Sequence, residues 1–287
     1  MNLDKLPGGT TQRSSVVQLQ TARWTSRSWL PAVTFVAACY AVTWLACVGF
    51  RSAAADGEMW AFWAFLLVTV WSPTFIALAI TMVFGGPSSV RSLLRRFRLR
   101  SSGLVWYIAA LLLPALSVLA AVLLARTLKQ GAPLIAIQAI FPTIAIQLGT
   151  GAVGEELGWR GFLLPLLQRK VSPVISALIM SSLWALWHAP AFFFPGMPQA
   201  LISPLGFFVA VVAFGVFLSL VFNKTKGCVV GTMLAHFAFN TALAFGGAQF
   251  GNVLWWSLAG ILSVLACWSI VVLSQTSGRF AQESAEA

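Results

Sequence analysis

Two adjacent carboxylates, Glu155 and Glu156, lie inside an otherwise apolar stretch, and Arg160 follows one helical turn after the second of them. The chain has seven acidic residues, and the other five lie in its tails or in a short connecting segment, where water can solvate them. At the centre of a bilayer a charged side chain costs roughly 2.5 to 3.5 kcal/mol on insertion scales, so this trio costs on the order of 9 kcal/mol before pairing. A chain that keeps such a cluster is expected to use it.

The two histidines of the chain, His188 and His236, also fall within long apolar runs. Asn240 follows His236 by four residues, so both share one face of a helix. If residues 169–172 form a turn, the helices on either side bring Glu155 and His188 to a similar depth. The sequence therefore predicts a single site assembled from three spans.

The chemistry that such a group supports is the activation of water. A carboxylate in a low-dielectric pocket is a stronger base than it is in water, which suits Glu155 to act as a general base. Arg160 keeps the neighbouring Glu156 charged, and the spacing of these two also allows a purely structural ion pair. A histidine and Asn240 then donate to the oxyanion that forms as water attacks a carbonyl.

Zinc offers an alternative use of the same side chains. Glu155, His188 and His236 are the ligand types of a catalytic zinc site that keeps a water in its fourth position. No His-Glu-x-x-His motif is present, so this interpretation rests on residue types alone. Trp184 and Trp187 are expected to pack in the core, and either is also a candidate for the substrate-binding wall.

The composition predicts the scaffold that holds these residues. The chain is 59% hydrophobic and only 9% charged, compared with about 25% charged residues in soluble domains. We therefore expect an all-α, polytopic transmembrane bundle of about eight spanning helices. The apolar runs place seven of them at about 29–50, 59–84, 104–128, 172–194, 200–222, 228–245 and 253–273.

An eighth apolar run, residues 134–169, is too long for one perpendicular helix. A continuous helix over it would reach about 54 Å at about 1.5 Å per residue, so the run must break or lie partly in the interface. Pro142 and the region Gly158 to Gly161 are both candidates for the break.

The basic residues predict the orientation of the bundle. Fourteen of them fall on one predicted face of the membrane and three on the other, which places both termini in the cytoplasm of a multi-pass cell-membrane protein. The segment 85–102 is arginine-rich and repeats apolar residues at helical spacing, as an amphipathic helix on an anionic leaflet does. Because the basic residues are scattered through short connections, the net charge of +11 does not predict binding to nucleic acid.

The domain organisation predicted from these patterns is simple. Residues 1–28 form a basic cytoplasmic tail, residues 29–274 a single transmembrane domain with its catalytic core at about 134–250, and residues 275–287 a short cytoplasmic tail.

The sequence resembles the CAAX protease and bacteriocin-processing family (CPBP, also called Abi) of intramembrane endopeptidases, and in particular the type II CAAX prenyl proteases. The resemblance covers about residues 134–250. It rests on three ordered motifs: Glu155-Glu156-xxx-Arg160, Trp184-xxx-His188 and His236-xxx-Asn240. The second motif usually begins with Phe in this family, and Trp184 departs from that.

The resemblance implies roles for these residues. Glu155 would activate water, Glu156 and Arg160 would orient and pair, and a third group would bind the water or stabilise the oxyanion: His188, His236 and Asn240. Members of the family have been described both as metalloendopeptidases and as glutamate proteases. We expect no obligatory metal here, with zinc as the alternative.

The expected function is hydrolysis of a peptide bond in a membrane-embedded or lipidated protein, which the resemblance implies is prenylated or CAAX-like. Two alternatives use the same cavity. One is a non-proteolytic membrane protein that binds an isoprenoid or a peptide, and the other is acid-base chemistry on an isoprenoid lipid.

Overall fold

The computed structural model describes residues 28–100, 103–128, 140–246 and 251–285, the last ten of these as backbone only. Within these ranges the regular structure is entirely helical, which confirms the predicted all-α class. The main helices are α1 (Leu30–Ala55), α2 (Met59–Leu94), α3 (Leu104–Thr127), α4 (Ile140–Gly149), α5 (Ala152–Glu156), α6 (Leu164–Gln168), α7 (Pro173–Trp187), α8 (Pro204–Lys224), α9 (Val229–Gly246) and α10 (Gly251–Ala285). Short helical turns complete the described chain: η1 (Arg95–Phe97), η4 (Leu157–Leu163), η5 (Ala189–Phe193) and η6 (Pro198–Leu201).

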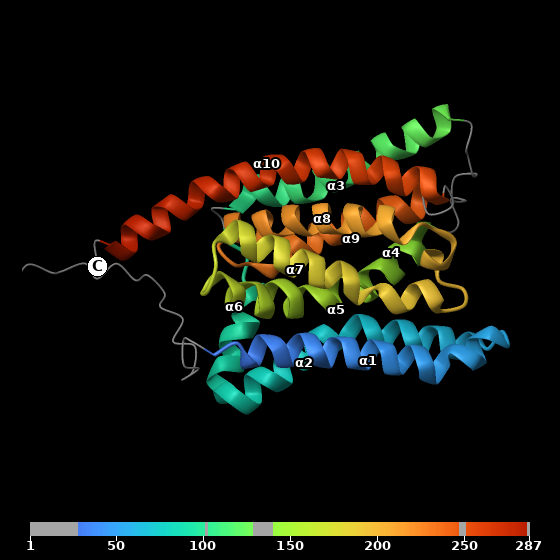
Figure 1. The fold of residues 1–287 in the computed structure, drawn as a ribbon, viewed down its shortest axis with the longest axis horizontal. Helices are drawn as coiled ribbons and strands as arrows, with labels where there is room; N and C mark the ends of the chain where they lie inside the picture. The colour runs from blue at the N-terminus through green and yellow to red at the C-terminus, as the bar shows by residue number, and fades with distance from the viewer. Residues whose placement is uncertain (1–27, 101–102, 129–139, 247–250, 286–287) are drawn as a thin grey trace, which may run out of the picture.

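Among the described residues, seven helices are long and apolar enough to cross a membrane. They correspond to the seven spans expected from the sequence, and the broken run α4 to α6 corresponds to the eighth. Successive passes alternate in direction, so the start of α1 and the end of α10 lie at the same end of the bundle (Figure 1). This arrangement supports a multi-pass integral membrane protein. The predicted basic tail, residues 1–28, lies outside the described residues except for Ser28.

Three helices are longer than the apolar patterns indicated, and the first of them, α1, ends at Ala55 rather than near residue 50. α2 continues past residue 84 to Leu94, with Gly86 in a non-helical conformation (φ 70°) that bends the chain before Pro87. The arginine-rich amphipathic piece is therefore helical, and it is attached directly to the second span. α10 continues to Ala285, so its backbone is helical through most of the predicted C-terminal tail.

The expected break in the long apolar run occurs at a third position. α4 ends at Gly149, and Gly151 has φ 57°, a left-handed conformation that glycine adopts without the penalty of a Cβ atom. Pro142 lies in the first turn of α4, where it interrupts no helix. The Gly158 to Gly161 region forms η4, a π-helical segment that widens the helix between α5 and α6 without ending it.

Close packing against α2 holds the segment that carries the carboxylates. A Cβ atom added to Gly154 would lie 2.6 Å from the carbonyl oxygen of Val70, and one added to Gly158 would overlap the carbonyl of Pro73. Only glycine permits this approach of two backbones, as in other helix pairs packed within membranes.

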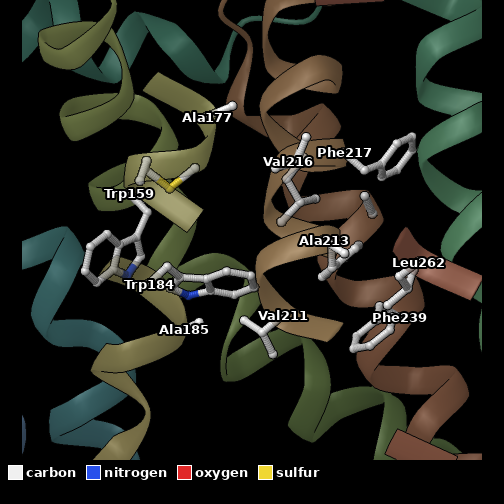
Figure 2. Close-up of a cluster of buried hydrophobic side chains, with 14 of the residues drawn as sticks. Trp159, Ala177, Trp184, Ala185, Val211, Ala213, Val216, Phe217, Phe239 and Leu262 are labelled. Carbon is white, nitrogen blue, oxygen red and sulfur yellow. The ribbon is translucent and has the colours of Figure 1, made fainter. Parts of the chain in front are cut away.

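The apolar core lies between α7, α8 and α9, and most residues of α8 are buried. Trp159 and Trp184 belong to the hydrophobic cluster that also contains Val211, Phe217 and Phe239 (Figure 2). The charged segment is thus packed among large apolar side chains, which exclude water from one of its faces.

Candidate active site

Glu156 is the centre of a buried ionic cluster. Its Oε1 atom accepts hydrogen bonds from Arg160 Nη1 and from His236 Nδ1, both at 2.8 Å. Glu156 and Arg160 have no exposed surface, and His236 is 4% exposed. The guanidinium of Arg160 also lies over the ring of Trp184, 4.1 Å from its centroid. The predicted pairing of Glu156 with Arg160 is present, and it extends to a histidine on α9.

Glu155 is the next residue along the chain, but its surroundings differ. The indole Nε1 of Trp184 donates a hydrogen bond to Glu155 Oε2 at 2.7 Å. Glu155 and Trp184 both line a cavity of about 440 Å³. One oxygen of Glu155 is therefore fixed by the indole, and the carboxylate still reaches an open space.

His188 caps the C-terminal end of α7, and its Nδ1 lies 2.8 Å from the carbonyl oxygen of Trp184. Because a carbonyl only accepts, Nδ1 carries the proton of this bond. In the neutral ring Nε2 then carries the lone pair, so His188 can accept a hydrogen bond in the cavity that it lines.

Three polar groups converge beside Gly151. An ideal Cβ position on this residue lies 2.9 Å from Asn240 Nδ2, 3.6 Å from His236 Nε2 and 3.7 Å from Glu155 Oε1. Because glycine has no side chain, the carboxylate, the imidazole and the amide face the open cavity on this side of the backbone, where a water molecule can contact them. The prediction that His236 and Asn240 share a face is thus met: both line the cavity with Glu155.

The predicted residues divide into two groups. The cavity walls include Glu155, Trp184, Trp187, His188, His236 and Asn240. Glu156 and Arg160 are not among these wall residues, and they contact the walls through His236 and Trp184.

The described residues do not gather the three ligands that the zinc alternative requires. Among the described residues, no group of three His, Cys, Asp or Glu side chains is placed to hold a metal ion. His236 and Glu155 converge beside Gly151, but His188 does not join them as a third ligand. The Nδ1 atoms of both histidines bind Trp184 and Glu156, so Nε2 is the nitrogen that each ring can offer to a ligand.

Sequence reasoning missed two features of this site. Trp184 was expected to pack or to form a wall, but its indole N–H also binds the candidate base, which a phenylalanine cannot do. Gly151 was not singled out. The signal available for it was a glycine four residues before Glu155 inside a run too long for one helix.

Residues 137–242 match the family model described as "Type II CAAX prenyl endopeptidase Rce1-like". The matched region contains the three motifs and the helices α4 to α9, apart from the end of α9. Residues of α1, α2 and α10, outside this region, also line the cavity. The family resemblance drawn from the motifs is confirmed over this region.

A particular relative is the "CAAX prenyl protease 2" of Methanococcus maripaludis, which is 26% identical to this chain over 106 residues. The alignment covers 35% of this chain and 39% of the relative. The chain therefore matches about two fifths of the length of that protein.

Proposed function

We propose that this chain is an intramembrane endopeptidase that hydrolyses a peptide bond of a membrane-associated, prenylated protein. The observation that carries the proposal is the convergence of Glu155 Oε1, His236 Nε2 and Asn240 Nδ2 on the side of Gly151 that carries no side chain. The family match over the same helices supports a CAAX-type substrate. The apolar walls of the cavity suit an isoprenoid chain, because they include Phe62, Leu66 and Phe207.

In the proposed reaction Glu155 removes a proton from the water beside Gly151, and the water oxygen attacks the carbonyl carbon of the scissile bond. Trp184 holds one carboxylate oxygen, so the other is directed at the water. Glu155 then passes the proton to the leaving nitrogen as the tetrahedral intermediate collapses.

Asn240 is the proposed oxyanion donor, because its amide Nδ2 lies beside Gly151, on the same side as Glu155 Oε1, where the attacked carbonyl must stand. Neutral His188 accepts rather than donates at Nε2, so we assign it to accept a hydrogen bond from an N–H of the incoming substrate. His236 links the two halves of the site, with Nδ1 on Glu156 and Nε2 beside the water. No step in this scheme requires a metal ion.

The experiment reconstitutes the purified protein in lipid nanodiscs with a farnesylated CAAX peptide and with the same peptide lacking the farnesyl group. Mass spectrometry of the products should show cleavage of the farnesylated peptide and much slower cleavage of the unmodified one. Equal cleavage of both peptides would remove the prenyl part of the proposal.

A second outcome separates the protease from a non-proteolytic binder. Retention of the intact farnesylated peptide, with no cleavage product at any enzyme concentration, would favour a protein that only binds. A change in the isoprenoid mass with an intact peptide would favour chemistry on the lipid.

The orientation in the membrane is a further part of the proposal. Because basic residues are in excess at one end of the bundle, we assign that end and both termini to the cytoplasm.

A further inference from the structure

A second cavity, of about 60 Å³, lies at the basic end of the bundle, apart from the candidate active site. It is formed where the bent end of α2 meets the segment from η4 to α6. This volume has room for roughly four water molecules, or for one small tetrahedral group. None of the residues that the structure describes in its walls is acidic, whereas Arg96 and Arg169 both line it.

Arg96 differs from the other arginines of its segment. Arg91, Arg95, Arg98 and Arg100 are exposed, but Arg96 turns inward. Its guanidinium lies 5.4 Å from the ring centroid of Phe222, and its Nη1 makes a long bond of 3.5 Å to the carbonyl of Gly227. That bond uses one of the five N–H donors of a guanidinium.

Thr81 supplies an independent observation. Its side chain is 5% exposed and lines the cavity, and its Oγ1 has no hydrogen-bond partner. Thr69 and Ser89, two other buried residues of α2, donate to a carbonyl of the preceding turn, to Phe65 and to Gly85. Thr74 Oγ1 also lacks a partner, but Thr74 does not line this cavity. A buried hydroxyl without a partner destabilises the fold, so a hydrogen-bond acceptor in this cavity would remove that cost.

Two positive charges that face one small space repel each other. An anion between them attracts both, and these attractions offset the repulsion. Guanidinium groups and a hydroxyl are the donors that phosphate oxygens take in proteins. The apolar remainder of the wall, which includes Leu93, Phe162 and Leu166, suits the acyl chains that continue from a headgroup.

We propose that this cavity binds a phosphate group, from a phospholipid headgroup or from free phosphate, through Arg96, Arg169 and Thr81. The site adjoins the segment that carries the carboxylates, since a Cβ at Gly161 would lie 3.6 Å from Arg96 Cδ. A bound phosphate therefore braces η4 directly after Arg160. The proposal stands whether or not the chain is a protease.

The test is native mass spectrometry of the full chain in detergent, titrated with phosphatidylglycerol in one arm and with inorganic phosphate at matched ionic strength in the other. The variants are Arg96→Gln and Thr81→Val, with Arg95→Gln as the matched control on the same segment. We expect one bound adduct per wild-type chain, an affinity about tenfold weaker in Arg96→Gln and weaker also in Thr81→Val, and no change in Arg95→Gln.

An adduct in the lipid arm alone assigns the site to a headgroup, and an adduct in the phosphate arm assigns it to phosphate itself. Equal affinity in all four proteins would mean attraction to the basic surface in general and would overturn the proposal, as would the absence of any adduct. If Arg96→Gln does not fold, Thr81→Val decides, because it keeps the shape of the side chain and removes only the hydroxyl.

Discussion

Glu155 and Glu156 are neighbours of the same residue type, yet they face two different regions of the molecule. Glu156 is enclosed with Arg160 and His236, and two cationic or polar partners share one of its oxygens. Glu155 has a single indole partner and opens onto a cavity of about 440 Å³. We infer from this difference that Glu156 holds the structure through its buried partners, whereas Glu155 is available to react with a molecule in the cavity.

The largest expected effect comes from Glu155→Gln. The amide oxygen can still accept from Trp184, so folding should be unchanged, whereas loss of the base should lower cleavage by about 10²- to 10⁴-fold. Peptide cleavage and thermal unfolding in detergent measure the two properties separately. A variant that cleaves at the wild-type rate would show that Glu155 is not the general base.

Glu156→Gln should show the opposite pattern. It leaves the buried guanidinium of Arg160 without a counter-charge, which costs about 3 to 5 kcal/mol of stability. Thermal or denaturant unfolding of the purified variant checks this. The matched control is Glu58→Gln, since Glu58 is exposed, and we expect no loss there. Wild-type stability in Glu156→Gln would show that this carboxylate is not structural.

Gly151→Ala tests whether the space beside Gly151 is needed for cleavage but not for folding. The added methyl group would stand 2.9 Å from Asn240 Nδ2, between the three polar groups that are proposed to contact the water, and the positive φ adds about 1 to 2 kcal/mol of strain. We expect cleavage to be lost while the protein remains folded. Gly149→Ala is the control, because nothing lies within 4 Å of its Cβ position. Equal activity of the two variants would show that the reacting water does not bind beside Gly151.

The smallest effect is expected from Trp184→Phe, which restores the residue usual in the family. It removes the N–H that holds Glu155 and keeps an aromatic ring beside Arg160, so we expect about a tenfold fall in cleavage rate, as for one hydrogen bond to a charged group. Binding of the substrate should change little. A change confined to binding would show that Trp184 serves the substrate wall rather than the carboxylate.

Much of the fold and of the site could be predicted because the cost of placing a side chain in a membrane depends mainly on its residue type. Carboxylates and histidines in apolar runs are costly, so Glu155, His188 and His236 stood out, and a spacing of four residues placed Asn240 beside His236. The seven long spans followed from hydropathy alone.

What could not be predicted depended on which of several equivalent residues the packing selects. The run 134–169 holds several glycines and a proline that could break a helix, and only the tertiary structure selects the left-handed Gly151. The bond from Trp184 to Glu155 depends on how two side chains meet across helices. The length of α2 was underestimated because Gly86 and Pro87 bend it without ending it.

The central claim is that Glu155 activates a water held by His236 and Asn240 and not by a metal ion. The most direct measurement is the single-turnover cleavage rate of protein whose metal content is determined by elemental mass spectrometry, before and after treatment with a chelator. We predict the same rate in protein freed of metal. A rate that disappears with about one zinc per chain and returns when zinc is restored would contradict the account.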